Sequence, residues 1–209
     1  AGVEPNEATY NMMVKAHSKR RDAAGALEWF RRMEDAGKKP DVFTYNSVLD
    51  VFAKKGDTEK SLEWFSDMKE AGVAPNLFTH NSILGAFAKK GDNDGTVKWL
   101  LSMDKAGIKP DEYTYNSILN TFAKVGDSDK SLEWFRKMED SGVKPNAVTY
   151  GTMVKAFAKK GDSDGSLVWF DKMVEAGVEP NLVTYGTMVL AFARQGDSEG
   201  SVEWFGRME

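Results

Sequence analysis

The sequence lacks several residue types on which common kinds of protein function depend. It has no cysteine and only two histidines, His17 and His80, which lie far apart along the chain. Disulfide frameworks, thiolate catalysis and thiolate metal sites are therefore excluded, and the two histidines offer no local pair of metal ligands. We expect no cofactor, no bound metal and no small-molecule substrate.

Long hydrophobic runs and a strong excess of one charge are also missing. The longest apolar run covers the six residues from Met188 to Ala193, whereas a membrane-spanning helix needs about 20. We therefore expect a water-soluble protein with no membrane partner. The formal net charge is -4, so attraction to phosphate would depend on how the basic residues are placed. The N-terminal residues show no targeting segment.

Prolines and tryptophans, by contrast, recur with a strict period. Successive prolines are 35 residues apart, at Pro5, Pro40, Pro75, Pro110, Pro145 and Pro180. The tryptophans have the same spacing, at Trp29, Trp64, Trp99, Trp134, Trp169 and Trp204. A fixed period of this length indicates a stacked array of one supersecondary unit.

Each unit is predicted to form two amphipathic helices. In the unit that begins at Val42, the first helix places one set of apolar side chains on one face, namely Tyr45, Val48, Leu49 and Phe52. Gly56 supplies the left-handed residue that commonly ends a helix, and Asp57 or Thr58 can cap the next one. That second helix is expected to end at Gly72 and to turn three apolar side chains inward: Leu62, Phe65 and Met68.

A single pair of such helices cannot bury its apolar faces, so the units are predicted to stack into one all-α solenoid domain. The boundaries are residues 7–41, 42–76, 77–111, 112–146, 147–181 and a partial unit at 182–209. Residues 1–6 repeat the sequence of residues 176–181 and are expected to be the tail of an upstream unit. This predicts a fragment of a longer array, or an engineered or excised one.

Two residue types in the second helix call for a packing explanation. We expect the tryptophans to lie in the core or between units, since bulky aromatics at helical spacing are usually buried. Glycine weakens the first turn of a helix. Close packing against a neighbour is the candidate reason why four second helices have a glycine near their start, at Gly25, Gly95, Gly165 and Gly200.

Four stretches of the chain resemble pentatricopeptide repeats of the pure 35-residue type. They are Val148-Thr149-Tyr150, the Ala-Phe-Ala-Lys-Lys-Gly-Asp of residues 156–162, the Leu-Glu-Trp-Phe-x-x-Met of residues 132–138, and the Gly-Val-x-Pro-Asn/Asp ending. The tetratricopeptide repeat, with a period of about 34 residues, fits less well. The resemblance implies a right-handed α-solenoid superhelix that binds single-stranded RNA, one base per unit. Departures include His80 in place of tyrosine, and Gly151 and Gly186 in place of a polar side chain.

The resemblance also implies which residues read the bases. One follows Thr-Tyr in the first helix, and the other follows the proline that closes the unit. The pairs are Asn11 with Asp41, Asn46 with Asn76, Asn81 with Asp111, Asn116 with Asn146, and Gly151 with Asn181, while Gly186 begins a sixth. Aspartate only accepts hydrogen bonds and suits the imino proton of uracil, whereas asparagine can face the ring nitrogen and amino group of cytosine. The predicted target is 5′-UCUCA-3′, where adenine follows from the extra room beside glycine.

A structural explanation of these polar residues stays open. Asparagine and aspartate are favoured in turns and caps, which accounts in part for those at the proline turn. It does not account for the asparagines inside the first helix, where asparagine is a mediocre helix former. Those four could instead bridge adjacent units by hydrogen bonds: Asn11, Asn46, Asn81 and Asn116.

Two further sets of residues accompany the predicted base readers. The residue before each threonine is Ala8 in the first unit and is expected to stack on bases in the others, at Phe43, Phe78, Tyr113, Val148 and Val183. The alternative is a buried hydrophobic staple. Basic residues near the end of each first helix are expected to contact phosphate: Lys19, Lys54, Lys89, Lys124, Lys159 and Arg194. The alternative is that they complement the negative end of the helix dipole.

Other functions receive less support from the sequence. No Ser/His/Asp set, phosphate loop or zinc-deaminase signature points to an enzyme. The main alternative is a protein-binding scaffold on the concave face of the solenoid, with partners in a ribonucleoprotein complex. The resemblance implies a role in organellar RNA processing, stabilisation or translation, in a mitochondrion or a chloroplast.

Overall fold

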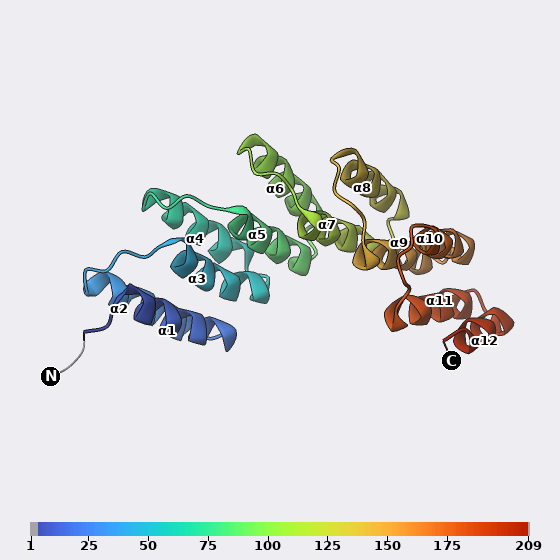
Figure 1. The fold of residues 1–209 in the computed structure, drawn as a ribbon, viewed down its shortest axis with the longest axis horizontal. Coiled ribbons are helices and arrows are strands. Elements are labelled where there is room, and N and C mark those ends of the chain that lie inside the picture. Colours follow the sequence, from blue (N-terminus) through green and yellow to red (C-terminus); the bar gives the residue numbers. More distant parts are fainter. Residues whose placement is uncertain (1–3, 209) are drawn as a thin grey trace. The chain divides into compact units, whose positions relative to one another are not determined.

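The protein is an all-α solenoid built from helical hairpins, as the period predicts. The computed structural model describes residues 4–208, which contain twelve helices and no strand (Figure 1). The 35-residue units are called repeats from here on. The chain divides into two larger compact units, residues 1–109 and 110–209, each of which holds several repeats. The first unit holds α1 (Glu7–Lys19), α2 (Ala23–Asp35), α3 (Val42–Lys55), α4 (Thr58–Glu70), α5 (Leu77–Lys90) and α6 (Asn93–Lys105). The second holds α7 (Glu112–Val125), α8 (Ser128–Asp140), α9 (Ala147–Lys160), α10 (Ser163–Glu175), α11 (Leu182–Arg194) and α12 (Ser198–Gly206).

Within each unit the first helices of successive repeats form a continuous layer. In the first unit α1 packs against α3 and α3 against α5, while α7, α9 and α11 do the same in the second. Each intervening second helix contacts its own first helix and the next one, as α2 does with α1 and α3. The layer of first helices carries most of the predicted site residues.

Local sequence signals set the helix boundaries where predicted. Asp41 caps α3 in a capping box, because its side chain accepts from the backbone N–H of Thr44 and the Thr44 hydroxyl accepts from the N–H of Asp41. Gly56 ends the helix with a φ of 74°, and Asp57, one of the two predicted candidates, caps α4. Arg21 occupies the equivalent place in the first repeat with a φ of 58°, a conformation that costs a non-glycine residue about 1 kcal/mol.

The predicted core of the second repeat is correct for the first helix and partly wrong for the second. Tyr45, Val48, Leu49, Phe52 and Met68 are buried. Leu62, predicted to point inward, is exposed, and the fully buried side chain on that side of α4 is Ser61. A helix with 3.6 residues per turn places Leu62 about 120° around the axis from Met68, whereas Ser61 is only about 20° away.

Tryptophans join successive repeats, which confirms their predicted packing role. The indole Nε1 of Trp64 donates to the backbone carbonyl of Tyr45, 3.0 Å away in its own repeat. The Trp64 ring also meets Phe30 of the preceding repeat edge to face, with centroids 4.8 Å apart. Each such ring therefore fills a space that belongs to two repeats, which explains why a bulky aromatic is placed there.

Close packing also explains the glycines at the start of four second helices. A Cβ added to Gly165 would lie 2.3 Å from Cδ1 of Phe157, and the glycines equivalent to it meet His17, Phe87 and Phe192 in the same way. Where lysine replaces the glycine, the equivalent phenylalanine is buried instead, and Lys130 lies over the ring of Phe122 at 5.2 Å. The glycines therefore make room for an aromatic or histidine ring of the preceding helix.

His80 occupies a site that tyrosine fills in the other repeats. Its ring is buried and lies 5.3 Å from that of Phe65 and 5.4 Å from that of Trp99, between centroids. Within the described residues its Nδ1 has no hydrogen-bond partner. Burial lowers the pKa of His80 and the nearby Lys69 lowers it further, so the neutral form is favoured. The fold accommodates the substitution, as expected.

Candidate nucleic-acid interface

The predicted base-reading pairs lie side by side wherever both members belong to one unit. The first-helix asparagine directs its Nδ2 at Oδ1 of the residue that caps the next first helix. The distances are 3.4 Å for Asn11 and Asp41, 3.3 Å for Asn46 and Asn76, and 3.5 Å for Asn116 and Asn146. The turn after the proline is therefore brought to the helix of the preceding repeat.

A threonine of the next repeat holds each of these asparagines. The Thr79 hydroxyl donates to Oδ1 of Asn46 over 2.7 Å, and Thr149 does the same to Asn116 over 2.7 Å. The Thr44 hydroxyl donates to Oδ1 of Asn11. The structural alternative is thus partly correct, because the asparagines do bridge repeats. The bridge engages the carbonyl oxygen and orients the amide Nδ2, which keeps a second N–H for another partner.

The second residue of each pair, the one after the proline, caps the next first helix with its Oδ1. The cap does not use the other polar atom of that side chain. Oδ1 of Asp41 accepts from the backbone N–H of Thr44 at 2.9 Å, and Oδ1 of Asn76 accepts from that of Thr79 at 3.0 Å. The remaining atom is the acceptor Oδ2 in Asp41 and the donor Nδ2 in Asn76. Capping and ligand recognition are therefore compatible at one residue.

The other predicted reading positions form no pair of side chains within one unit, because Asn81 and Asp111 belong to different units and Gly151 and Gly186 have no side chain. Asn81 is buried on α5, and Asp111 caps α7. Asn181 caps α11, but Gly151 offers no amide to it. A Cβ added to Gly151 would lie 3.5 Å from Oγ1 of Thr184, an ordinary contact, and one added to Gly186 would meet nothing within 4 Å. The glycine repeats therefore leave open the space that the asparagine amide fills elsewhere.

The predicted stacking residues are exposed, so the buried-staple alternative is wrong for them. Between 54% and 74% of each is accessible. Each precedes its reading position by three residues on the same helix, about one turn away. They are Phe43, Phe78, Tyr113, Val148 and Val183.

The predicted phosphate contacts divide into different environments. Lys54 forms an ion pair with Asp50 at 2.6 Å. The Lys89 ammonium donates to the backbone carbonyl of Lys54, and Arg194 Nη1 donates to that of Ala158 at 3.2 Å. These bonds go to the last turn of the preceding first helix, as the helix-dipole explanation requires. Lys19, Lys124 and Lys159 also lie in the last turn of their first helices.

Comparison with known repeat families is consistent with this geometry. Models of the PPR repeat family match residues 5–54, 40–89, 77–124, 114–159 and 151–194, and a PPR repeat model matches residues 183–209. The chain belongs to the PPR repeat family. A comparison with curated proteins finds no match.

Solved structures of other PPR proteins share the fold. The pentatricopeptide repeat protein PPR10 from maize is 28% identical, with a TM-score of 0.80, over 97% of this chain and 29% of that one. PPR10 in complex with an 18-nt psaJ RNA element is 24% identical, with a TM-score of 0.64, over 99% and 36% of the two chains. The PPR domain of Arabidopsis thaliana protein-only RNase P 1 in complex with tRNA is 21% identical, with a TM-score of 0.71, over 91% and 98%. The chain thus spans about 29% of the maize protein.

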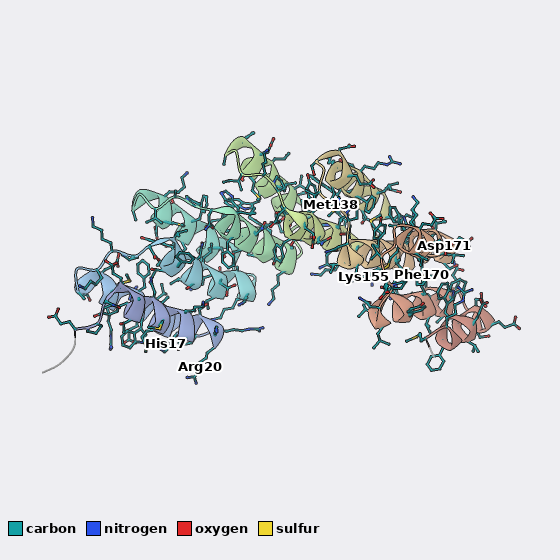
Figure 2. All side chains as sticks on the ribbon, in the orientation of Figure 1. His17, Arg20, Met138, Lys155, Phe170 and Asp171 are labelled. Carbon is teal, nitrogen blue, oxygen red and sulfur yellow. The ribbon has the colours of Figure 1, made fainter. Side chains whose placement is uncertain are left out.

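Sequence reasoning missed Lys155, which adds a positive charge to the first-helix layer of this PPR protein. It is exposed on α9 (Figure 2), and its Nζ donates to Oδ1 of Asn120 at 3.2 Å. Partial burial lowers the pKa of Lys155, and the positive charges of Lys124 and Lys159 lower it further. Lys155 follows Gly151 by four residues, so a search for basic residues one turn beyond the reading position would have found it.

A carboxylate at the fourth reading pair was also missed. Glu112, the first residue of α7, accepts a hydrogen bond from Nδ2 of Asn146. One of the two N–H donors on Nδ2 of Asn146 is therefore engaged, and the other is the one left for a ligand. No sequence signal identified this contact, because it joins the starts of two successive first helices.

Across residues 4–208, no group of three or more histidine, aspartate or glutamate side chains is arranged to hold a metal ion. No helix in the same range combines the length and apolar character needed to cross a bilayer.

Proposed function

We propose that the protein binds single-stranded RNA through the layer of first helices, one base per repeat, without a catalytic step. The observation that carries the proposal is the polar atom left over at each capped pair. Asp41 presents the acceptor Oδ2, which suits the N3–H donor of uracil, and Asn76 presents the donor Nδ2, which suits the N3 acceptor of cytosine. The two capping residues are thereby chemically distinct toward the two pyrimidines.

The first-helix asparagine supplies a second contact. Its remaining Nδ2 hydrogen points to the same edge and suits the carbonyl oxygen that both pyrimidines carry. The exposed side chains one turn earlier provide surfaces between which bases stack, an interaction worth about 1 to 3 kcal/mol per base for aromatic residues. Together these features favour a pyrimidine target close to 5′-UCUCA-3′.

Relatives support the class of ligand. Two of the similar structures are complexes with RNA, that of PPR10 with an 18-nt psaJ RNA element and that of the PPR domain of the Arabidopsis enzyme with tRNA. By analogy with the family, we place the protein in organellar RNA processing, stabilisation or translation, in a mitochondrion or chloroplast.

The decisive experiment compares 5′-UCUCA-3′ with its U/C-swapped partner 5′-CUCUA-3′ in fluorescence-anisotropy titrations at low salt. The first RNA is expected to bind more tightly. Asp41→Asn preserves the cap, since both residues cap well, and should change the preference of the first position from uracil to cytosine.

Two other results would have clear meanings. Equal affinities for the two RNAs would overturn the base assignment while leaving RNA binding intact. Absence of binding to either RNA at low salt would overturn the proposal and favour a protein-binding scaffold.

A further inference from the structure

Most tryptophans of the second helices carry a positive charge over the ring, supplied by the residue three positions later. The distances from the charged group to the ring centroid lie between 4.1 and 4.8 Å. The pairs are Arg32 with Trp29, Lys137 with Trp134, Lys172 with Trp169, and Arg207 with Trp204. A cation in this position is attracted by the electron-rich face of the indole.

The second repeat breaks this pattern. The residue three positions after Trp64 is Asp67, and among residues 4–208 no lysine or arginine lies over the Trp64 ring. Trp64 is also more accessible than its equivalents in the second unit, since Trp169 and Trp204 are each only 3% exposed. The place that a cation takes in four repeats is therefore open and has a carboxylate beside it.

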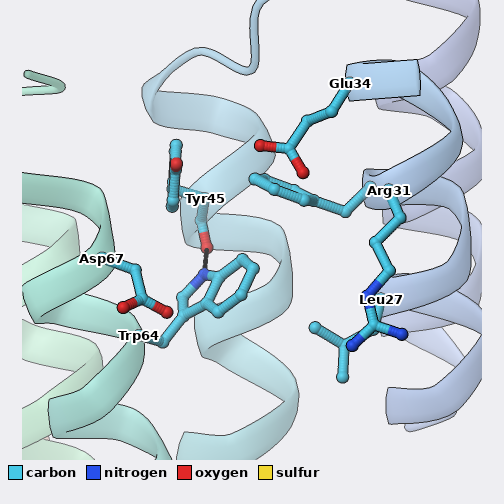
Figure 3. Close-up of a pocket in the computed structure, with 7 residues that line it drawn as sticks. Leu27, Arg31, Glu34, Tyr45, Trp64 and Asp67 are labelled. Atoms are coloured by element: carbon cyan, nitrogen blue, oxygen red, sulfur yellow. Dashed lines mark hydrogen bonds between the residues drawn. The ribbon is translucent and has the colours of Figure 1, made fainter. Parts of the chain in front are cut away.

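A cavity of about 250 Å³ lies at this place (Figure 3). Its aromatic part is formed by Phe30, Tyr45 and Trp64, and its rim carries the carboxylates of Glu34 and Asp67. Glu34 comes from α2 and Asp67 from α4, so the two acids flank the cavity from successive second helices (Figure 3). The remaining lining residues are Leu27 and Arg31, and the Arg31 side chain runs beside Leu27.

Negative charge lies close to the aromatic wall of the cavity. Burial raises the pKa of the Tyr45 hydroxyl, and the negative charges of Glu34 and Asp67 raise it further. Both acids are exposed side chains. A cation inside the cavity would therefore meet two carboxylates and an indole face, opposed only by Arg31.

The junction of the fourth and fifth repeats shows how the chain itself fills the equivalent place. Six of the seven positions have the same residues there, 105 places later in the sequence: Leu132, Phe135, Arg136, Glu139, Tyr150 and Trp169. The seventh is Lys172 in place of Asp67, and its ammonium lies 4.5 Å from the centroid of Trp169. The chain thus fills one copy of this arrangement with its own cation and leaves the other copy without one.

We propose that the cavity of Phe30, Tyr45, Trp64, Glu34 and Asp67 is a binding site for an organic cation, a guanidinium or primary ammonium group supplied from outside the chain. The group stacks on Trp64 in the place that Lys172 takes on Trp169, and the two carboxylates hold its N–H donors. The site shares no residue with the predicted RNA contacts. Its occupancy is therefore independent of the proposed function.

The test follows the indole N–H resonance of Trp64 in a ¹⁵N-labelled sample, assigned by its loss in Trp64→Phe. The probes are N-acetyl-arginine methylamide and n-butylammonium, with the neutral citrulline analogue as the control. A saturable shift with the cations but not with citrulline is expected. A single arginine in a Gly/Ser peptide separates the sources: tighter binding of the peptide indicates a protein side chain, and equal binding a free cation. Absence of a saturable shift with any cationic probe would overturn the proposal.

Reciprocal variants supply the matched controls. Asp67→Lys recreates the arrangement of the fifth repeat and should weaken the arginine probe roughly tenfold or more, because the new ammonium occupies the ring. Lys172→Asp should open a second site, seen as a saturable shift of the Trp169 indole resonance. Both changes reproduce residues already present in the array, so both variants are expected to fold. Unchanged probe affinity in Asp67→Lys would contradict the assignment.

Discussion

The two units present the same helices but different chemistry along the first-helix layer. The first unit has two complete polar pairs, at Asn11 with Asp41 and at Asn46 with Asn76, and it neutralises Lys54 with Asp50. The second unit has one complete pair, in which Glu112 engages one of the two Asn146 donors, and then the glycine repeats. In the second unit the positive charges of Lys124, Lys155 and Lys159 lie close enough to interact with one another.

The difference separates two contributions to RNA binding. Hydrogen-bonding pairs distinguish bases, whereas positive charges attract phosphate irrespective of sequence. We therefore expect the first unit to supply most of the base selectivity and the second unit most of the salt-dependent attraction. Four variants test differences between the two units, two in RNA binding and two in packing, in order of expected effect.

Gly151→Asn should give the second unit the selectivity of the first. The new amide can reach the Thr184 hydroxyl and Asn181, so the repeat should favour cytosine over adenine by about 1 to 3 kcal/mol, the discrimination typical of a paired base contact. Competition between 5′-UCUCA-3′ and 5′-UCUCC-3′ measures the change. Gly186→Asn is the control, because no neighbouring atom lies within 4 Å of its added Cβ. An unaltered preference in Gly151→Asn would contradict the role of the pair.

His80→Tyr should give the third repeat the tyrosine that Tyr150 supplies in the fifth repeat. Replacing a buried nitrogen without a partner is expected to stabilise the protein by about 1 to 2 kcal/mol near pH 7. The lowered pKa of His80 means that the unfolded chain binds a proton more readily, so native stability is complete above pH 6.5 and is lost as pH falls below it. The advantage of the variant should therefore be larger at pH 5 than at pH 8.

Denaturant unfolding at both pH values measures this effect. Tyr150→His is the reciprocal control and should introduce the same loss of stability at low pH into the second unit. A constant difference between wild type and His80→Tyr across the pH range would show that His80 does not titrate as inferred.

Gly165→Ala should lower the free energy of unfolding by about 1 kcal/mol, because overpacking against Phe157 exceeds the gain in helix propensity. Lys60→Ala, at the equivalent position of the first unit, adds no Cβ and removes only the cation 5.7 Å from the centroid of the Phe52 ring, so it should change stability by less. Urea titrations of the two variants provide the comparison. A stabilised Gly165→Ala would indicate that Phe157 moves to the buried place of Phe52 at little cost.

Lys159→Gln should reduce the slope of log K against log salt for RNA binding by about 0.7, the value for one phosphate contact on a single strand. Lys54→Gln should reduce it by less, because Asp50 already neutralises that ammonium. Affinities measured over a series of salt concentrations give the two slopes. Equal reductions would remove the distinction between the units.

Sequence reasoning predicted the helices, the caps and the core role of the tryptophans, because these depend on spacing within one repeat. It paired the predicted reading residues through the family resemblance, and three of those pairs are in hydrogen-bond contact in the structure. Their role in reading bases stays a prediction. Sequence reasoning was wrong about Leu62, since apolar character alone did not reveal that Ser61 faces inward on α4. Lys155 escaped it although its spacing from Gly151 is a signal in the sequence. Glu112 and the cavity at Trp64 escaped it because each depends on which side chains of successive repeats meet.

The amino-acid sequence by itself determined the period of 35 residues, the helical hairpin and the residues on each helix face, since local turn chemistry and apolar spacing act over a few residues. Only the tertiary structure decided which polar atom remains after capping and which tryptophan face stays open. These outcomes depend on contacts between residues about 30 positions apart in the chain, as between Asn46 and Asn76, and such contacts exist only once the repeats have stacked.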